Sequence, residues 1–85
     1  MIEIKFDEKN KSAIAYDNNV KIGICEFIEE NEYWNIVHTE VSKLYQGQGI
    51  AKKLVTAIIE NAEKSNKEII ADCSYAKKII ERRKE

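Results

Sequence analysis

The stretch Tyr45-Gln46-Gly47-Gln48-Gly49-Ile50-Ala51-Lys52-Lys53 (YQGQGIAKK) holds two of the three glycines in this 85-residue chain. The two glycines stand one residue apart, directly before the longest helical pattern in the sequence. Because glycine has no Cβ, it lets a backbone turn sharply or come close to a ligand. The stretch therefore marks a boundary between two halves of the chain that follow different periods.

Before the glycines, apolar residues recur with a period of two. Ile2, Ile4 and Phe6 alternate with charged residues, and the residues from 13 to 16 continue the pattern weakly. Asp17-Asn18-Asn19-Val20 supplies residues that tolerate a positive φ and so predicts a hairpin turn. Apolar residues also recur in 21–29 and 33–41, joined by a polar turn. We expect four antiparallel strands in a meander.

After residue 41 the period becomes helical, with Ile50, Leu54 and Ile58 on one stripe. This predicts a helix over about 48–65, then a short strand over 68–72 and a final helix over about 75–83. Strands four and five would be the parallel arms of a crossover around the long helix. The carboxyl ends of both strands and the amino end of the helix would then meet at the two glycines, where open α/β sheets bind ligands.

Composition limits the possible functions. A chain of 85 residues is expected to form one domain, 1–85, and the net charge of −1 gives no broad basic surface for nucleic acid or an anionic membrane. No apolar run is long enough to span a bilayer, and the start lacks the pattern of a signal peptide, so we expect a cytoplasmic protein. Two unpaired cysteines and one histidine make a disulfide framework or a structural zinc site improbable.

The glycine stretch predicts a site for an anion. The first turn of a helix has about four N–H groups without partners and carries partial positive charge. This first turn has no acidic residue and places Lys52 and Lys53 there, which is unfavourable unless an anion is bound. A tight turn with two solvated lysines is the alternative. A Walker loop is absent, and the dinucleotide-binding pattern fails where Lys52 replaces its third glycine.

Gln46-Gly47-Gln48-Gly49-Ile50-Ala51 resembles the Gln/Arg-x-x-Gly-x-Gly/Ala pyrophosphate motif of the GNAT superfamily, the acetyl-CoA-dependent N-acetyltransferases. The chain is most similar to the small, single-domain GNAT-like proteins, which it resembles over nearly its whole length. Two further stretches carry this resemblance: His38-Thr39-Glu40-Val41, and Cys73-Ser74-Tyr75-Ala76. It departs from many relatives in having Ser42-Lys43 in place of two prolines, and it has no short aromatic tail.

The resemblance implies a trimmed GNAT fold of the α+β or α/β class, without the helices after strand one and the final strands that wall the acceptor site. The acceptor side is therefore expected to be open. Acetyl-CoA or CoA is the implied cofactor, and a backbone N–H near Thr39 to Val41 is expected to polarise the thioester. The implied cofactor-binding residues are Val41, Gln46, Gly47, Gln48, Gly49, Ile50, Ala51, Lys52 and Tyr75.

Three side chains are candidates for catalysis. His38 and Glu40 share one strand face by the period of two and could act as the general base, although each could also be an ordinary structural or solvated residue. Cys73 precedes a helix whose amino end, with Lys77 and Lys78, would favour a thiolate, while Asp72 would oppose it. Cys73 could carry the acetyl group, or simply pack between sheet and helix; Cys25 is interpreted as core.

The leading hypothesis is an N-acetyltransferase that transfers an acetyl group to an amine acceptor, either a small molecule or a protein lysine. A non-catalytic module that binds CoA or acetyl-CoA is the main alternative. A small interaction protein with a plain glycine turn is a third. We expect a monomer or weak homodimer, with no nucleic-acid or membrane partner and no metal.

Overall fold

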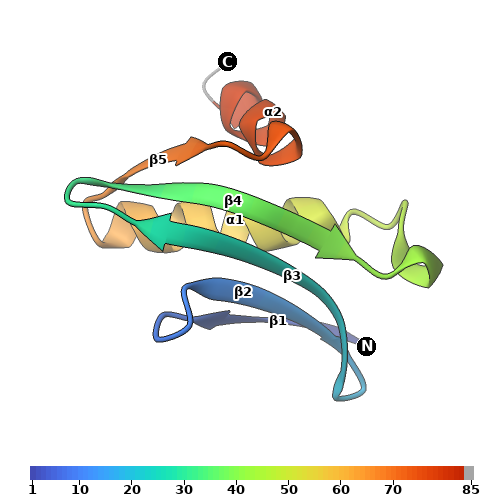
Figure 1. Ribbon diagram of the computed structural model, residues 1–85. Helices are drawn as coiled ribbons and strands as arrows, with labels where there is room; N and C mark the ends of the chain where they lie inside the picture. Colours follow the sequence, from blue (N-terminus) through green and yellow to red (C-terminus); the bar gives the residue numbers. More distant parts are fainter. Residues whose placement is uncertain (84–85) are drawn as a thin grey trace.

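The computed structural model describes residues 1–83 and contains one five-stranded sheet with two helices (Figure 1). The sheet order follows the chain from β1 to β5, and only the β4–β5 pair is parallel. The predicted meander, crossover and α+β fold class are confirmed. The elements are β1 (Ile2–Asp7), β2 (Ser12–Asp17), β3 (Val20–Glu29), β4 (Tyr33–Val41), the 3₁₀ turn η1 (Lys43–Tyr45), α1 (Ile50–Lys64), β5 (Glu68–Ala71) and α2 (Ser74–Arg83).

Turn residues fix the ends of several elements. Asn18 and Asn19 both have positive φ in the β2–β3 turn, as a tight hairpin connection requires. At the end of α1, Asn66 is left-handed, and the N–H groups of Asn66 and Lys67 donate to the carbonyls of Glu63 and Ala62. This pair of bonds is a Schellman motif, which satisfies the last carbonyls of the helix. Both boundaries lie where the sequence predicted them.

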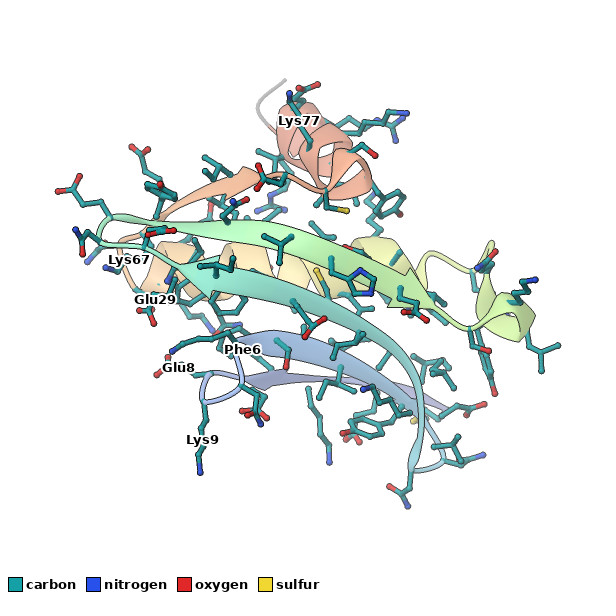
Figure 2. All side chains as sticks on the ribbon, in the orientation of Figure 1. Phe6, Glu8, Lys9, Glu29, Lys67 and Lys77 are labelled. Carbon is teal, nitrogen blue, oxygen red and sulfur yellow. The ribbon has the colours of Figure 1, made fainter. Side chains whose placement is uncertain are left out.

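The core lies between α1 and one face of the sheet. The apolar stripe of α1 is buried against the strands, and Phe27 and Trp34 stack with their ring centroids 4.4 Å apart, with Phe6 on the same stack. At the far end of the sheet, Lys67 Nζ donates to the carbonyl of Asn31 at 2.5 Å and joins the start of β5 to the β3–β4 turn (Figure 2). The buried stripe of α1 is Ile50, Leu54, Val55, Ile58, Ile59 and Ala62.

A bulge in β4 changes which side chains face the core. The β3–β4 register runs from Phe27 opposite Ile36 to Glu26 opposite His38, which leaves Val37 as an extra residue. Trp34 and Ile36 are buried before the bulge, whereas His38 is exposed after it. The bulge therefore reverses the parity of the strand, and its odd-numbered residues face α1 beyond Val37.

The two parallel strands separate soon after the bulge. β5 pairs with β4 only from Tyr33 to Ile36, and the carbonyl of Ile36 accepts hydrogen bonds from the N–H groups of both Asp72 and Cys73. Beyond this point β4 continues toward η1 paired only with β3, while the chain after β5 turns into α2 (Figure 1). The separation opens the sheet next to the start of α1. The sheet face opposite α1 is covered by no helix within residues 1–83.

Candidate active site

The glycine loop holds two residues in the left-handed region. Gly47 has φ 84° and Gly49 has φ 77°, a conformation that is unfavourable for residues with a Cβ. A Cβ at either position would meet no other atom within 4 Å, so the space above both residues is open. Glycine is therefore needed here for its backbone conformation, and the loop presents an uncovered main chain.

The N–H groups at the start of α1 are free within the described part of the chain. The first hydrogen bond of the helix runs from the Lys53 N–H to the Gly49 carbonyl at 3.1 Å. The four N–H groups from Gly49 to Lys52 have no acceptor among residues 1–83, and the first turn holds no acidic residue. Since α1 has 15 residues, its positive amino end is well developed. These amides are available to an anion.

A cleft of about 620 Å³ opens beside this loop, where β4 and β5 separate. It brings together most of the predicted cofactor-binding residues, but Gln48 and Lys52 are not part of its lining. Gln48 lies exposed in the loop, and Lys52 lines a neighbouring groove along α1. Thr39 and Tyr45 line the cleft, although neither side chain was singled out from the sequence. The lining residues are Thr39, Val41, Tyr45, Gln46, Gly47, Gly49, Ile50, Ala51 and Tyr75.

The main chain of β4 also faces this cleft. The Ser42 N–H donates to the Ile22 carbonyl at 2.7 Å, so these two residues form a hydrogen-bonded pair. Hydrogen-bonded and non-hydrogen-bonded pairs alternate along antiparallel strands, so Thr39 and Val41 make no main-chain hydrogen bonds to β3. Their N–H groups point toward the gap that β5 has left. The Val41 carbonyl points the same way, because it accepts a hydrogen bond of 3.1 Å from Gln46 Nε2. The N–H predicted near Thr39 to Val41 thus has two candidates.

Tyr45 anchors the loop to the end of β2, two strands away in the sheet. Its hydroxyl donates to Asp17 Oδ2 at 2.6 Å, and Asp17 Oδ1 lies 3.1 Å from the amino group of Met1. The Tyr45 hydroxyl and then the terminal ammonium lower the pKa of Asp17. The position of Tyr45 directly before the glycine motif could have marked it as a residue of the site, but nothing local points to Asp17 as its partner.

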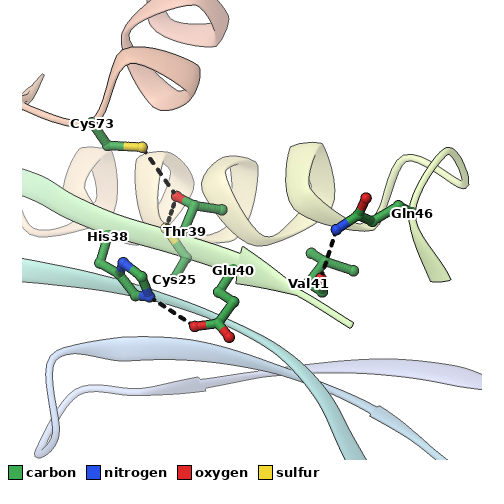
Figure 3. A network of polar contacts seen from close by, with 7 residues as sticks. All are labelled: Cys25, His38, Thr39, Glu40, Val41, Gln46 and Cys73. Atoms are coloured by element: carbon green, nitrogen blue, oxygen red, sulfur yellow. Dashed lines mark hydrogen bonds and ion pairs between the residues drawn. The ribbon is translucent and has the colours of Figure 1, made fainter. Parts of the chain in front are cut away.

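Cys73 lies directly before α2, beside Thr39 (Figure 3). Its Sγ is 3.6 Å from Thr39 Oγ1, and the same oxygen is 3.3 Å from Cys25 Sγ. Partial burial raises the pKa of Cys73, but the Ala76 N–H, the Thr39 hydroxyl and the Tyr75 N–H together lower it below its ordinary value. Burial raises the pKa of Cys25 to about 11, so this thiol stays protonated at neutral pH.

His38 and Glu40 lie on the sheet face away from α1. They share this face, as the sequence indicated, and His38 Nε2 is 3.2 Å from Glu40 Oε2 (Figure 3). Both side chains are exposed, and neither lines the cleft. The expectation that they lie close to the thioester rested on an uninterrupted strand, and the bulge at Val37 turns them to the uncovered face instead.

Two further properties of the described residues bear on the site. No group of three His, Cys, Asp or Glu side chains among residues 1–83 is arranged to hold a metal ion. Within the same range, neither helix is long and apolar enough to cross a bilayer.

The glycine loop has free amides and lies at the start of a helix that crosses over between two separating parallel strands. This arrangement is the GNAT fold that the motif predicted. The family model described as GCN5-related N-acetyl-transferase matches residues 4–85, and the chain belongs to this family. Members of the family act on amine acceptors.

Solved structures agree with this assignment. A GCN5-like protein from Staphylococcus aureus is 37% identical, with a TM-score of 0.72, and the match covers 95% of this chain and 79% of that one. A second S. aureus protein, described as a probable acetyltransferase, is 17% identical with a TM-score of 0.73. The match covers 100% of this chain and 90% of that one.

A larger relative of the same fold has a bound ligand. The GNAT family acetyltransferase from Elizabethkingia anophelis, with acetyl-CoA bound, is 20% identical with a TM-score of 0.68. The match covers 86% of this chain, which spans about half (51%) of the Elizabethkingia protein. No protein with a curated description matches the chain.

Proposed function

We propose that residues 1–85 form a single domain that acts as an acetyl-CoA-dependent N-acetyltransferase. The observation that carries this proposal is the set of four free N–H groups from Gly49 to Lys52, beside an open cleft of about 620 Å³ that Gly49, Ile50 and Ala51 line. A diphosphate satisfies such amides and the helix dipole together. The acetyl-CoA bound to the Elizabethkingia protein supports this choice of anion.

The residues around the cleft fit the rest of the ligand. The glycine loop and the amino end of α1 would hold the diphosphate, with Gln46 keeping the loop closed against the Val41 carbonyl. The N–H groups of Thr39 and Val41 would bond an extended chain lying along the open edge of β4, as a missing strand would. Tyr75, which is 43% exposed at the cleft, would contact the ligand with its ring. Lys52 and Gln48 would add polar contacts at the loop.

Cys73 is the proposed nucleophile. Acetyl-CoA supplies an activated thioester when bound. The Cys73 thiolate would form a bond to the acetyl carbon as the bond to the CoA sulfur breaks, releasing CoA, which then takes up a proton. A neutral amine would next attack the acetyl group on Cys73, lose a proton, and return Cys73 as a thiolate. The Thr39 or Val41 N–H could stabilise the oxyanion that forms in these steps.

His38 and Glu40 are proposed to serve the acceptor. An amine must lose a proton before it can react, and a histidine paired with a carboxylate can accept that proton. Both side chains are exposed on the face that no helix of residues 1–83 covers, which gives the acceptor a route to β4. On this proposal, His38 would take the proton on the uncovered face, before the amine reaches Cys73 on the other side of β4, and Glu40 would orient its ring.

Thermal unfolding with acetyl-CoA, CoA and ATP tests the binding step. A ligand at 100 times its dissociation constant stabilises a protein by about 2.7 kcal/mol. We expect acetyl-CoA and CoA to raise the melting temperature and ATP to have no comparable effect. Stabilisation by ATP alone would overturn the proposed ligand.

Intact mass then separates an enzyme from a CoA-binding module. We expect one acetyl adduct after incubation with acetyl-CoA, lost in Cys73→Ala and discharged by a reactive amine from a panel of polyamines, small amines and lysine peptides. Binding of CoA with no turnover of any acceptor would favour the non-catalytic module.

A further inference from the structure

Thr39 occupies a position between the two cysteines. Its Oγ1 lies 3.3 Å from Cys25 Sγ and 3.6 Å from Cys73 Sγ, so one hydroxyl contacts both sulfur atoms (Figure 3). Cys25 is fully buried, whereas Cys73 is partly exposed and contacts Thr39, which lines the cleft. The three side chains come from β3, β4 and the start of α2, which are distant in the sequence. They form a continuous line from the core to the site.

The chemistry of the three groups sets the direction of their hydrogen bonds. When protonated, the Cys73 thiol donates to Thr39 Oγ1. A thiolate can only accept, so ionisation of Cys73 requires Thr39 to turn and donate its hydroxyl proton instead. The Thr39 oxygen keeps its lone pairs, and the nearest donor to them is the buried Cys25 thiol. Because Cys25 stays protonated at neutral pH, its S–H is available for this bond. The protonated Cys25 thus favours the orientation of the hydroxyl in which Thr39 serves Cys73.

The strand geometry holds the hydroxyl in place. Thr39 and Cys25 are directly opposite each other at a position without main-chain bonds, where side chains in an antiparallel pair approach most closely. The bulge at Val37 turns Thr39 toward α1 and the cleft; in an uninterrupted strand it would face solvent. Threonine is also branched at Cβ, which restricts its χ1 rotation.

Charged neighbours do not account for the lowered pKa of Cys73, whose causes are hydrogen bonds. The Asp72 carboxylate accepts a hydrogen bond from the Asn35 amide at 3.0 Å and, as an anion, would oppose a thiolate. His38 and Glu40 project from the opposite face of β4, and Lys77 lies on the side of α2 away from the sheet (Figure 2). The adjacent Lys78 is exposed. The residues that α1 buries against the rest of the protein are all apolar. Neutral hydrogen-bond donors remain as the groups that favour the thiolate.

From this geometry we propose that Thr39 is a positioning residue that stabilises the Cys73 thiolate through its hydroxyl, and that the Cys25 thiol orients this hydroxyl by donating to its oxygen. The inference rests on the proposed function only in treating Cys73 as the nucleophile. Its consequence is a property of the free protein, a faster reaction of Cys73 with an electrophile.

The test is the rate of Cys73 alkylation by iodoacetamide across pH, followed by intact mass without acetyl-CoA. Thr39→Val keeps the shape and removes the hydroxyl, whereas Thr39→Ser keeps the hydroxyl. Thr39→Val loses a hydrogen bond to a charged group, whose contribution is reduced by the partial exposure of Cys73. We therefore expect alkylation of Cys73 in this variant at pH 7 to be roughly three- to tenfold slower than in the wild type. The rate profile should also move to higher pH. Thr39→Ser should stay close to the wild-type profile.

Cys25→Ala tests the second link. Cys25→Ala alone should slow the alkylation of Cys73 less than Thr39→Val does. Combined with Thr39→Val, it should cause no further slowing, because Cys25 acts only through the Thr39 hydroxyl. Equal rates for the valine and serine variants would overturn the role of Thr39. An additive effect of Cys25→Ala would overturn the role of Cys25. Normal alkylation chemistry without acetyl-CoA binding would leave this inference standing and remove the proposed function.

Discussion

Substitution of Gly49 separates the conformation of the glycine loop from its access to a ligand. Gly49 is the N-cap of α1 with φ 77° and ψ 13°, and a Cβ there would meet nothing within 4 Å. Gly49→Ala therefore costs only the left-handed conformation, about 1–2 kcal/mol. For a domain of this size that lowers the melting temperature by about 5–15 °C.

The effect on CoA binding should be larger. The new methyl group stands beside the amides that are proposed to hold the diphosphate, and losing one hydrogen bond to a charged group costs about 1.5–3 kcal/mol. That corresponds to a dissociation constant raised roughly 10- to 150-fold. Calorimetric titration with CoA, at a temperature where the variant is fully folded, measures it.

Two other substitutions serve as controls for Gly49→Ala. Gly49→Asn tolerates the left-handed region, so it should recover much of the stability but not the affinity. Gly23→Ala should instead affect mainly the stability of the fold. A Cβ there would lie 3.1 Å from the Glu40 carbonyl oxygen and 3.3 Å from both Leu54 and Val41, but away from the amides of the glycine loop. It should therefore reduce stability and change CoA affinity less than Gly49→Ala does. An affinity for CoA within twofold of wild type in Gly49→Ala would refute the reasoning.

Three further results are expected. In the native protein iodoacetamide should label Cys73 alone, because Cys25 is buried and burial raises its pKa to about 11. Cys25 should react only after unfolding. Labelling of both thiols at equal rates in native conditions would contradict the burial of Cys25. Asp17→Asn should lower the melting temperature at neutral pH. Folding lowers the pKa of Asp17, so the ionised carboxylate stabilises the protein above the pKa of the unfolded state. This stabilisation is lost as the pH falls through the pKa of the folded state. Melting curves of both proteins should therefore converge in acid, and a constant difference at all pH values would argue against the contact. Tyr45→Phe removes the hydrogen bond to Asp17 and should weaken CoA binding a fewfold by loosening the loop, which titration can check; unchanged affinity would show that the loop needs no such anchor.

The sequence predicts the fold well where each signal is local. The period of two in the first half, the helical stripe from Ile50 to Ala62 and the asparagines of the β2–β3 turn each act over a few residues, and the structure confirms them. The glycine loop is equally local, because Gly47 and Gly49 are needed for their own backbone angles.

The side-chain arrangement at β4 could not be read in the same way. Strict alternation gives His38 and Glu40 the same parity as Trp34 and Ile36, which are buried. The bulge at Val37 breaks this alternation, and it depends on the register with β3, which is a property of two strands and not of one. Thr39 therefore faces the cleft in place of His38. The Tyr45–Asp17 contact is likewise tertiary, since 28 residues separate its partners.

A titration of ¹⁵N-labelled protein with CoA, and separately with pantetheine, tests the proposed site most directly. With CoA, the amide resonances from Gly49 to Lys52 should shift most, together with those of Thr39 and Val41. Pantetheine lacks the diphosphate and should shift only the two β4 amides. Saturating CoA that leaves the Gly49 to Lys52 amides unmoved would contradict the proposed site.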